Sequence, residues 1–177
     1  MTSAQDQTPQ ESMGIDPVER RWMISAGVLL VVFLIGITVA GFAAGFQLPG
    51  VEGRVDPATI TEEGPFSTPG LRQISDTEFE AYVVARIFAY DPAEIVIPAG
   101  STLTVFVTSA DVQHGFKVTD TNLNLQIVPG HVSKLSATFE TPGEYRVICT
   151  EYCGTGHAAM FGTVKVVSPA EFQALEG

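Results

Sequence analysis

A stretch of 24 uncharged and mostly apolar residues, from Met23 to Phe46, divides the molecule into two parts. As a helix it would rise about 36 Å, enough to cross a hydrocarbon layer of about 30 Å with some tilt. The run is longer than the apolar segment of a cleavable signal peptide, which has about 7–15 residues. We therefore predict a transmembrane helix over residues 21–47, with Trp22 at the membrane interface.

The charges that flank this stretch predict its orientation. Arg20 and Arg21 lie directly before it, and the next basic residue along the chain is Arg54. Because basic residues favour the cytoplasmic side, residues 1–20 are predicted to form a cytoplasmic tail, with the C-terminal part outside the membrane. Residues 48–75 are rich in Gly and Pro and are predicted to form an irregular linker along the lipid surface.

From residue 76 to residue 177 the pattern changes to short β-like runs separated by turns such as Pro129-Gly130 and Pro142-Gly143. Such spacing favours a β-sandwich or barrel. A short helix is predicted over Ser168–Glu176, with Ser168 as its N-cap. The predicted strands are 81–90, 94–97, 102–108, 116–119, 123–128, 132–139, 145–149 and 162–167.

The part of the chain after the apolar stretch is acidic. From Gln47 onward there are 16 acidic and 7 basic residues, a balance of −9 out of −11 for the whole chain. A field of this sign repels nucleic acid, so no nucleic-acid partner is expected. Attraction of a basic partner, a saline habitat and plain solubility are the open explanations for this acidity.

Four potential metal ligands lie within twelve residues, in the order Cys149, Cys153, His157 and Met160. A further histidine, His114, stands upstream, and the chain has no cysteine outside this segment. Thiolate, imidazole and thioether groups together select copper over magnesium, calcium or manganese. The sequence therefore predicts a copper site.

The second cysteine distinguishes between kinds of copper site. A mononuclear blue-copper site uses one Cys, two His and a weak Met, which would leave one thiol over. Two thiolates that bridge two copper ions use every ligand. A disulfide and a structural zinc site, which would leave Met160 idle, are the alternatives. His131 follows a Pro-Gly turn, fits no ligand spacing and is predicted to be a surface residue.

This constellation resembles the dinuclear CuA centre of the cytochrome c oxidase subunit II family. The resemblance extends from the membrane helix to about Val167. It implies a Greek-key cupredoxin barrel, in which loops at one end bring His114 to the Cys149–Met160 segment. The motifs that carry it are His114-Gly-Phe116, Pro142-Gly143-Glu144-Tyr145, the Cys-x-Glu-x-Cys core and Phe161-Gly162.

The family resemblance also implies roles for individual residues. In many relatives the side chain of the residue corresponding to Glu151 reaches a magnesium ion at the contact with subunit I. Gly154 and Gly156 are predicted to allow the loop unusual backbone angles. The implied copper ligands are the bridging thiolates of Cys149 and Cys153, the imidazoles of His114 and His157, the weak thioether of Met160 and the backbone carbonyl of Glu151.

The chain departs from the commonest family pattern in having one candidate membrane helix and no Trp-rich segment. Both departures resemble the shorter subunit II of B-type heme–copper oxidases. Where the Trp-rich segment would stand, Phe88 and Tyr90 are candidates for electron uptake, and core packing is the alternative. Glu19 resembles a carboxylate near the proton-uptake mouth, although a Glu at a helix start is equally well explained by the helix dipole.

The resemblance predicts the electron-input subunit of a respiratory terminal oxidase, a part of the enzyme that does no bond chemistry itself. A soluble carrier such as cytochrome c or a small copper protein would reduce two copper ions held by this chain, and heme in subunit I would receive the electrons and reduce oxygen to water. The predicted location is a prokaryotic plasma membrane, crossed once.

Other copper proteins are less compatible with the sequence. A membrane-tethered mononuclear copper carrier is the main alternative, although such proteins more often use clusters of Met and His. The CuA domain of nitrous oxide reductase is accompanied by a large second domain for which this chain is too short. Quinol oxidase relatives have lost the copper ligands that are present here.

Overall fold

The computed structural model describes residues 14–43 and 50–176, which belong to two compact units that are considered separately. The N-terminal unit contains one helix, α1 (Pro17–Ala43). It begins four residues before the predicted start, because the Asp16 carboxylate accepts a hydrogen bond from the Val18 amide at 2.7 Å and Pro17 occupies the first helical position. The predicted tail thus ends in helix, while residues 1–13 and the predicted helix end at 44–47 lie outside the described residues.

Helix α1 is long and apolar enough to cross a membrane. None of its side chains is buried within its own unit. Its only charged residues are Glu19, Arg20 and Arg21, all near its N-terminal end. An apolar surface on every side is typical of a helix whose solvent is lipid.

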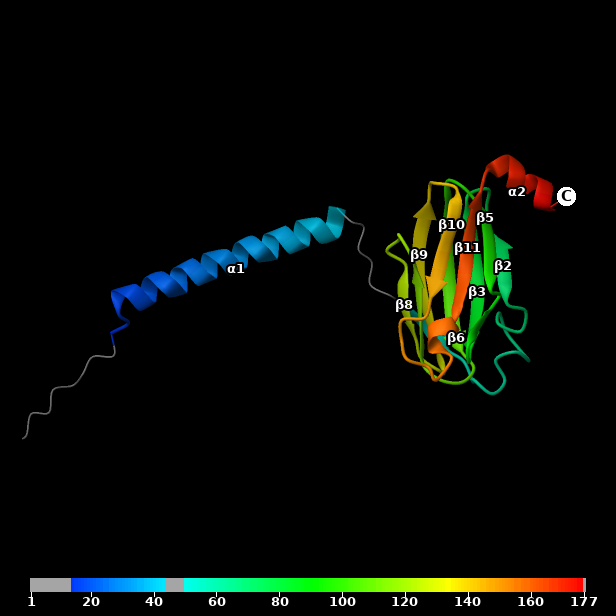
Figure 1. The fold of residues 1–177 in the computed structure, drawn as a ribbon, viewed down its shortest axis with the longest axis horizontal. Coiled ribbons are helices and arrows are strands. Elements are labelled where there is room, and N and C mark those ends of the chain that lie inside the picture. Colours follow the sequence, from blue (N-terminus) through cyan, green and yellow to red (C-terminus); the bar gives the residue numbers. More distant parts are fainter. Residues whose placement is uncertain (1–13, 44–49, 177) are drawn as a thin grey trace, which may run out of the picture. The chain divides into compact units, whose positions relative to one another are not determined.

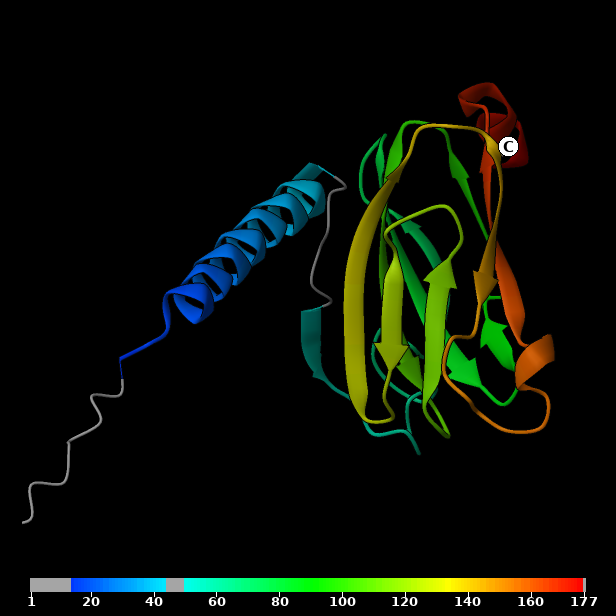
Figure 2. The ribbon, with the colours of Figure 1, turned by 60° about the vertical axis from the view of Figure 1, so that its left-hand side comes forward.

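Two β-sheets make up the described part of the C-terminal unit (Figures 1 and 2). One has the order β1-β9-β6-β3-β2, with β4 also paired to β3, and the other has the order β5-β11-β10-β7-β8. The pairs β3/β6 and β5/β11 are parallel and the rest are antiparallel. The strands are β1 (Gly50–Arg54), β2 (Gly70–Gln73), β3 (Glu78–Arg86), β4 (Ala89–Asp91), β5 (Glu94–Pro98), β6 (Ser101–Ser109), β7 (His114–Val118), β8 (Asn124–Ile127), β9 (His131–Phe139), β10 (Gly143–Ile148) and β11 (Phe161–Val167).

The core lies between the two sheets and follows from the alternation of apolar residues along the strands. In β11, for example, Val164 and Val166 are buried, whereas Phe161 is exposed. The prediction of a mainly β, Greek-key cupredoxin barrel preceded by one apolar helix is confirmed. Fully buried members of this core include Ala81, Val83, Ile97, Leu103, Val105, Phe116, Leu125 and Val164.

The end of the barrel away from the metal-ligand segment is covered by α2 (Pro169–Glu176), which confirms the predicted terminal helix (Figure 1). Ser168 caps it, because its hydroxyl accepts a hydrogen bond from the Glu171 amide at 3.2 Å. Phe172 packs edge-on against Phe79 of β3, with ring centroids 5.5 Å apart. The helix is therefore part of the barrel core rather than a loose tail.

The structure differs from the irregular linker predicted for residues 48–75. Strand β1 pairs with β9 and strand β2 pairs with β3, so both belong to the six-stranded sheet. Between them, Ile60 and Phe66 are buried in a second small apolar cluster on the outer side of that sheet, against Val84 and Phe106. Pro57, Gly64 and Pro65 lie in turns or bends between β1 and β2, whereas Gly50, Gly53 and Gly70 lie within these two strands, so the composition of the segment indicated a linker where the chain forms sheet.

Candidate metal centre

His114 is the first residue of β7, and its side chain is completely buried. Its Nε2 lies 2.8 Å from an oxygen of Asp111. The same carboxylate accepts hydrogen bonds from the amides of Ile87 and Val112, both at 2.6 Å. Burial acts to raise the pKa of Asp111, but these hydrogen bonds outweigh it and hold the pKa below its ordinary value.

The ionised Asp111 carboxylate can only accept hydrogen bonds, so Nε2 of His114 carries the hydrogen and Nδ1 carries a free lone pair. Nδ1 is buried and has no hydrogen-bond partner within the described part of the chain. A buried nitrogen without a partner is costly unless something binds it. The ligand atoms of His114, Cys149 and Cys153 all lie within 4.8 Å of one another, so this lone pair belongs to a cluster that is arranged to hold a metal ion.

The segment between β10 and β11 supplies the other candidate ligands. Sγ of Cys153 lies 3.9 Å from Sγ of Cys149, 3.7 Å from Nδ1 of His157 and 3.7 Å from Sδ of Met160. Sγ of Cys149 lies 3.2 Å from the backbone oxygen of Glu151. The six residues predicted from the sequence are therefore gathered in one place, with Cys153 at the centre.

The donor set fits copper. The two cysteines are free thiols in this structure, so neither is occupied by a disulfide. The thioether of Met160 is only 2 % exposed and contacts Cys153, whereas a zinc site would have no use for it. His131 lies at the start of β9, is partly exposed and is absent from the metal-binding cluster of the described residues.

Burial raises the pKa of the Cys153 thiol to about 11, and the neighbouring Cys149 contributes in the same direction. An apolar, enclosed site disfavours a negative charge on sulfur. A metal ion reverses this preference, because the thiolate is the form that binds it. Copper uptake by this site should therefore release protons.

This raised pKa predicts how the cysteines react when copper is absent. In reduced, copper-free protein, Cys153 should be alkylated slowly by iodoacetamide at pH 8, and its rate should rise with pH until about 11. In urea the same residue should titrate at the ordinary value of about 8.5. Peptide mass spectrometry measures both rates. Equal rates in folded and denatured protein at pH 8 would contradict the burial of this thiol.

The two ligand-bearing segments meet at Gly115. Its amide nitrogen lies 3.5 Å from Sγ of Cys149, and its carbonyl accepts a hydrogen bond from the Tyr90 hydroxyl. Burial, with a smaller effect of Cys149, raises the pKa of Tyr90, so the phenol stays protonated and continues to donate. Tyr90 is therefore a buried residue that holds the backbone beside the metal ligands.

We call residues 149–160, between β10 and β11, the metal-binding loop. The segment between β3 and β4 covers this loop from another side. The ring of Phe88 lies against Gly154 and Gly156, and a Cβ added at Gly156 would be 2.4 Å from a ring carbon. Gly154 has a positive φ of 130°, as predicted, whereas Gly156 has an ordinary φ of −93°. At Gly156 glycine is needed because the ring is so close.

Asp111 is a candidate functional residue that the sequence pattern did not single out. Its position three residues before His114 is the signal that was available. Metal-binding histidines usually donate their second N–H to a carboxylate or carbonyl, which fixes the ring and its tautomer. Asp111 does this here, and it also holds the backbone next to Phe88 through the Ile87 amide.

Replacing Asp111 by Ala should lower the copper affinity by about 10- to 100-fold, because the His114 ring loses the group that orients it. Competition against a chelator of known affinity measures the change. Asp76→Ala is the control, since this exposed carboxylate lies in the turn between β2 and β3, far along the barrel. An affinity unchanged by Asp111→Ala would mean that packing alone orients His114.

The remaining predicted residues occupy different surroundings. Glu151 is partly exposed on the metal-binding loop, and Glu19 is exposed in the first turn of α1. Phe88 is half-buried against the loop, while its neighbour Ile87 is 49 % exposed. Tyr90 is 3 % exposed, so the core alternative holds for its side chain.

Comparisons with known proteins agree on one family. The family model of the cytochrome c oxidase subunit II periplasmic domain matches residues 71–167. Cytochrome c oxidase subunit 2 of Thermus thermophilus is 43 % identical over 152 residues, which are 84 % of this chain and 90 % of the relative.

Two solved structures resemble this one. A heme–copper terminal oxidase dimer contains a chain that is 34 % identical, with a TM-score of 0.70, covering 85 % of this chain and 99 % of that chain. The periplasmic domain of cytochrome oxidase subunit II from Bradyrhizobium japonicum is 21 % identical, with a TM-score of 0.50, covering 54 % of this chain and 88 % of that one. The second likeness concerns the fold alone.

Proposed function

Since this chain belongs to the cytochrome c oxidase subunit II family, we propose that its C-terminal domain holds a dinuclear CuA centre. The chain is the electron-input subunit of a heme–copper oxidase, and subunit I of that oxidase is its partner. The observation that carries the dinuclear proposal is the pair of free thiols 3.9 Å apart, with Nδ1 of His157 3.7 Å from Cys153 and a ring nitrogen of His114 within 4.8 Å of both sulfurs. When bound, the copper pair supplies a one-electron carrier between a soluble donor and heme.

Each proposed ligand has a structural role. Cys149 and Cys153 would bridge the two ions, with His114 and His157 as terminal ligands. The Met160 thioether and the Glu151 carbonyl would occupy the weak positions, at the same loop. The buried thiols and the apolar barrel behind them exclude water, and a rigid barrel limits rearrangement when the charge of the site changes.

Electron uptake is proposed at Phe88 and the exposed Ile87 beside it. The Ile87 amide donates to one oxygen of Asp111, whose other oxygen contacts the His114 ring. A hydrogen-bonded connection therefore runs from the surface to a proposed ligand. Tyr90, which the sequence suggested for the same task, would act behind this surface by holding Gly115. The donor would be a soluble cytochrome c or a small copper protein.

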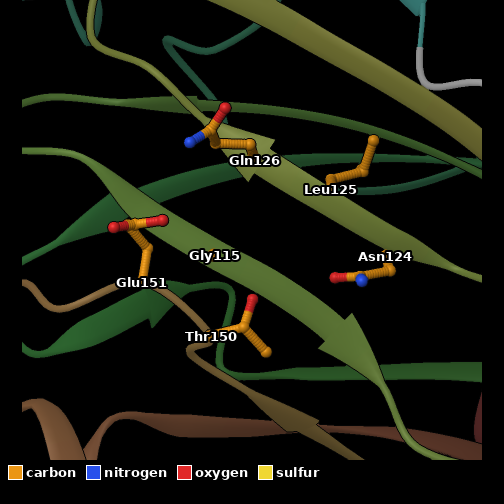
Figure 3. Close-up of a pocket in the computed structure, with 6 residues that line it drawn as sticks. All are labelled: Gly115, Asn124, Leu125, Gln126, Thr150 and Glu151. Carbon is orange, nitrogen blue, oxygen red and sulfur yellow. The ribbon is translucent and has the colours of Figure 1, made fainter.

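Glu151 borders a cleft of about 310 Å³ (Figure 3). Thr150 and Glu151 reach it from the metal-binding loop, and Asn124 and Gln126 reach it from β8. Carboxylate, amide and hydroxyl oxygens suit magnesium, and this supports a magnesium ion shared with subunit I at Glu151.

Glu19 is proposed to serve proton uptake on the cytoplasmic side of the membrane. The membrane is proposed to be a prokaryotic plasma membrane that α1 crosses once, which would leave the copper domain on the periplasmic side.

The full-length chain loaded with copper tests the dinuclear proposal. Two copper ions per chain, a purple colour and hyperfine structure shared by both nuclei in the EPR spectrum are expected. One copper ion, a blue colour and hyperfine structure from one nucleus would instead support a mononuclear carrier. Copper analysis and the two spectra on one sample distinguish these outcomes.

A further inference from the structure

The outer face of the β5-β11-β10-β7-β8 sheet carries an apolar pair at its metal end. Ile148 of β10 lies opposite Phe161 of β11 and opposite Lys117 of β7 in the strand register. Val147 is buried in the core, so its neighbour Ile148 projects to the outer face. Arg146 lies two residues before Ile148 and projects the same way. We call Lys117, Arg146, Ile148 and Phe161 the Ile148 patch.

The two cations of the Ile148 patch have no carboxylate partner within residues 14–43 and 50–176. The Arg146 guanidinium stacks 4.4 Å from the centre of the Phe161 ring. Neither Arg146 nor Lys117 forms an ion pair with any residue that the structure describes. They stand out in a domain that carries 16 acidic and 7 basic residues from Gln47 onward. An apolar centre flanked by two unpaired cations is complementary to an apolar surface that bears carboxylates.

The Ile148 patch borders the proposed copper ligands directly. Arg146, Ile148 and Phe161 line a cleft of about 290 Å³. The other side chains that line this cleft belong to Cys149, His157, Ala158 and Met160. A partner seated on the patch would therefore lie beside the ligand end of the barrel.

Two observations assign the patch to the membrane partner rather than to the soluble donor. The Glu151 cleft, where the proposed magnesium ion would be shared with subunit I, opens on the same sheet face as the Ile148 patch. Asn124 and Gln126 of this cleft are the exposed residues of β8, and Asn124 lies opposite Lys117 of the patch. Ile87 and Phe88, the proposed uptake residues, lie instead between β3 and β4, which belong to the other sheet. Contact with subunit I and electron uptake from the soluble donor thus involve different elements of the barrel.

We propose that the Ile148 patch docks on the heme-bearing subunit I, and that Lys117 and Arg146 pair there with acidic side chains of that subunit. This inference rests on the proposed function, because it needs a heme-bearing partner for this chain. It adds the face of the barrel that the partner covers and the charge that the partner presents. An ion pair closed off by the apolar residues would be sheltered from salt.

The test uses affinity-tagged full-length chain produced together with subunit I. Lys117→Glu and Arg146→Glu, singly and together, place like charges against the partner, and heme recovered per tagged chain is measured. The double variant should lose at least about tenfold of the heme at moderate salt. Lys165→Glu is the matched control, because Lys165 projects from the same sheet face near the other end of β11, and its heme recovery should stay within about twofold of wild type.

A second measurement separates docking from folding and from donor binding. The copper spectrum of each variant chain, and its rate of reduction by reduced cytochrome c, should match wild type. The milder Lys117→Gln/Arg146→Gln pair is used if the reversed charges disturb the spectrum, with an intermediate loss of heme expected. Unchanged heme recovery, or slower reduction by cytochrome c with heme recovery intact, would overturn the assignment. If the wild-type chain itself recovered no heme, the proposed function would fall, and this inference with it.

Discussion

Cys153→Ser is expected to abolish the proposed dinuclear copper centre. Sγ of Cys153 is within 3.9 Å of Cys149 Sγ, His157 Nδ1 and Met160 Sδ, so it is the one atom that contacts all three. A serine hydroxyl has nearly the same shape, but it is a hard ligand that binds copper far more weakly than a thiolate. Copper per chain should fall from two to at most one, and the purple colour should disappear.

Oxidase activity with a soluble donor should fall by about 100-fold or more in Cys153→Ser, which corresponds to about 2.7 kcal/mol in the activation free energy. Metal analysis, EPR spectroscopy and oxygen consumption are measured on the same oxidase preparation. His131→Gln is the control, since His131 lies at the start of β9 and is not one of the six proposed ligands, and it should keep both ions and full activity. A serine variant that kept two copper ions and a shared hyperfine pattern would refute the bridging role.

The sequence was sufficient for the elements whose signal is local. The eight predicted runs correspond to strands from β3 to β11, and the break of the first run into β3 and β4 at residues 87–88 was the main difference. The ligand spacing from Cys149 to Met160 was equally informative, because one loop carries five of the six candidate ligands. The order and spacing of residues along the chain were enough to predict these strands and these ligands.

Contacts between distant segments could not be predicted in the same way. Strand β1 forms only because the edge of β9 is free to pair with it, and nothing within residues 50–54 indicates that edge. The role of Asp111 depends on its contact with the buried ring of His114, and Arg146 is distinctive only because it forms no ion pair with any residue that the structure describes. Both require the barrel to be known.

Gly156 and Gly115 illustrate the same limit for glycine. Unusual backbone angles were predicted for both Gly154 and Gly156, and they occur at Gly154 alone. Gly156 has an ordinary angle and is pressed by the Phe88 ring, while Gly115 is pressed by the loop that carries Cys149. Close approach of two segments leaves no trace in the local sequence pattern.

Gly115→Ala should have the second large effect, because a methyl group has no room between β7 and the metal-binding loop. The added Cβ would lie 2.1 Å from Oγ1 of Thr150, 2.6 Å from the Thr150 amide nitrogen and 3.0 Å from the Glu151 nitrogen. Two of these three are backbone atoms that cannot rotate aside. The Tyr90 hydroxyl holds Gly115 on its other side, so the loop must move instead.

Moving Thr150 displaces its neighbour Cys149, so the variant should lose stability and copper together. Overpacking of this kind costs about 1–3 kcal/mol of unfolding free energy, and the copper affinity should fall in addition. Thermal unfolding of the copper-free domain and chelator competition measure the two losses separately. Gly143→Ala is the matched control, because it also adds one methyl group to a strand, with Cε2 of Tyr145 as its nearest neighbour at 3.9 Å. Should Gly115→Ala bind copper as tightly as Gly143→Ala does, the close contact between β7 and the loop would not be what holds His114 and Cys149 together.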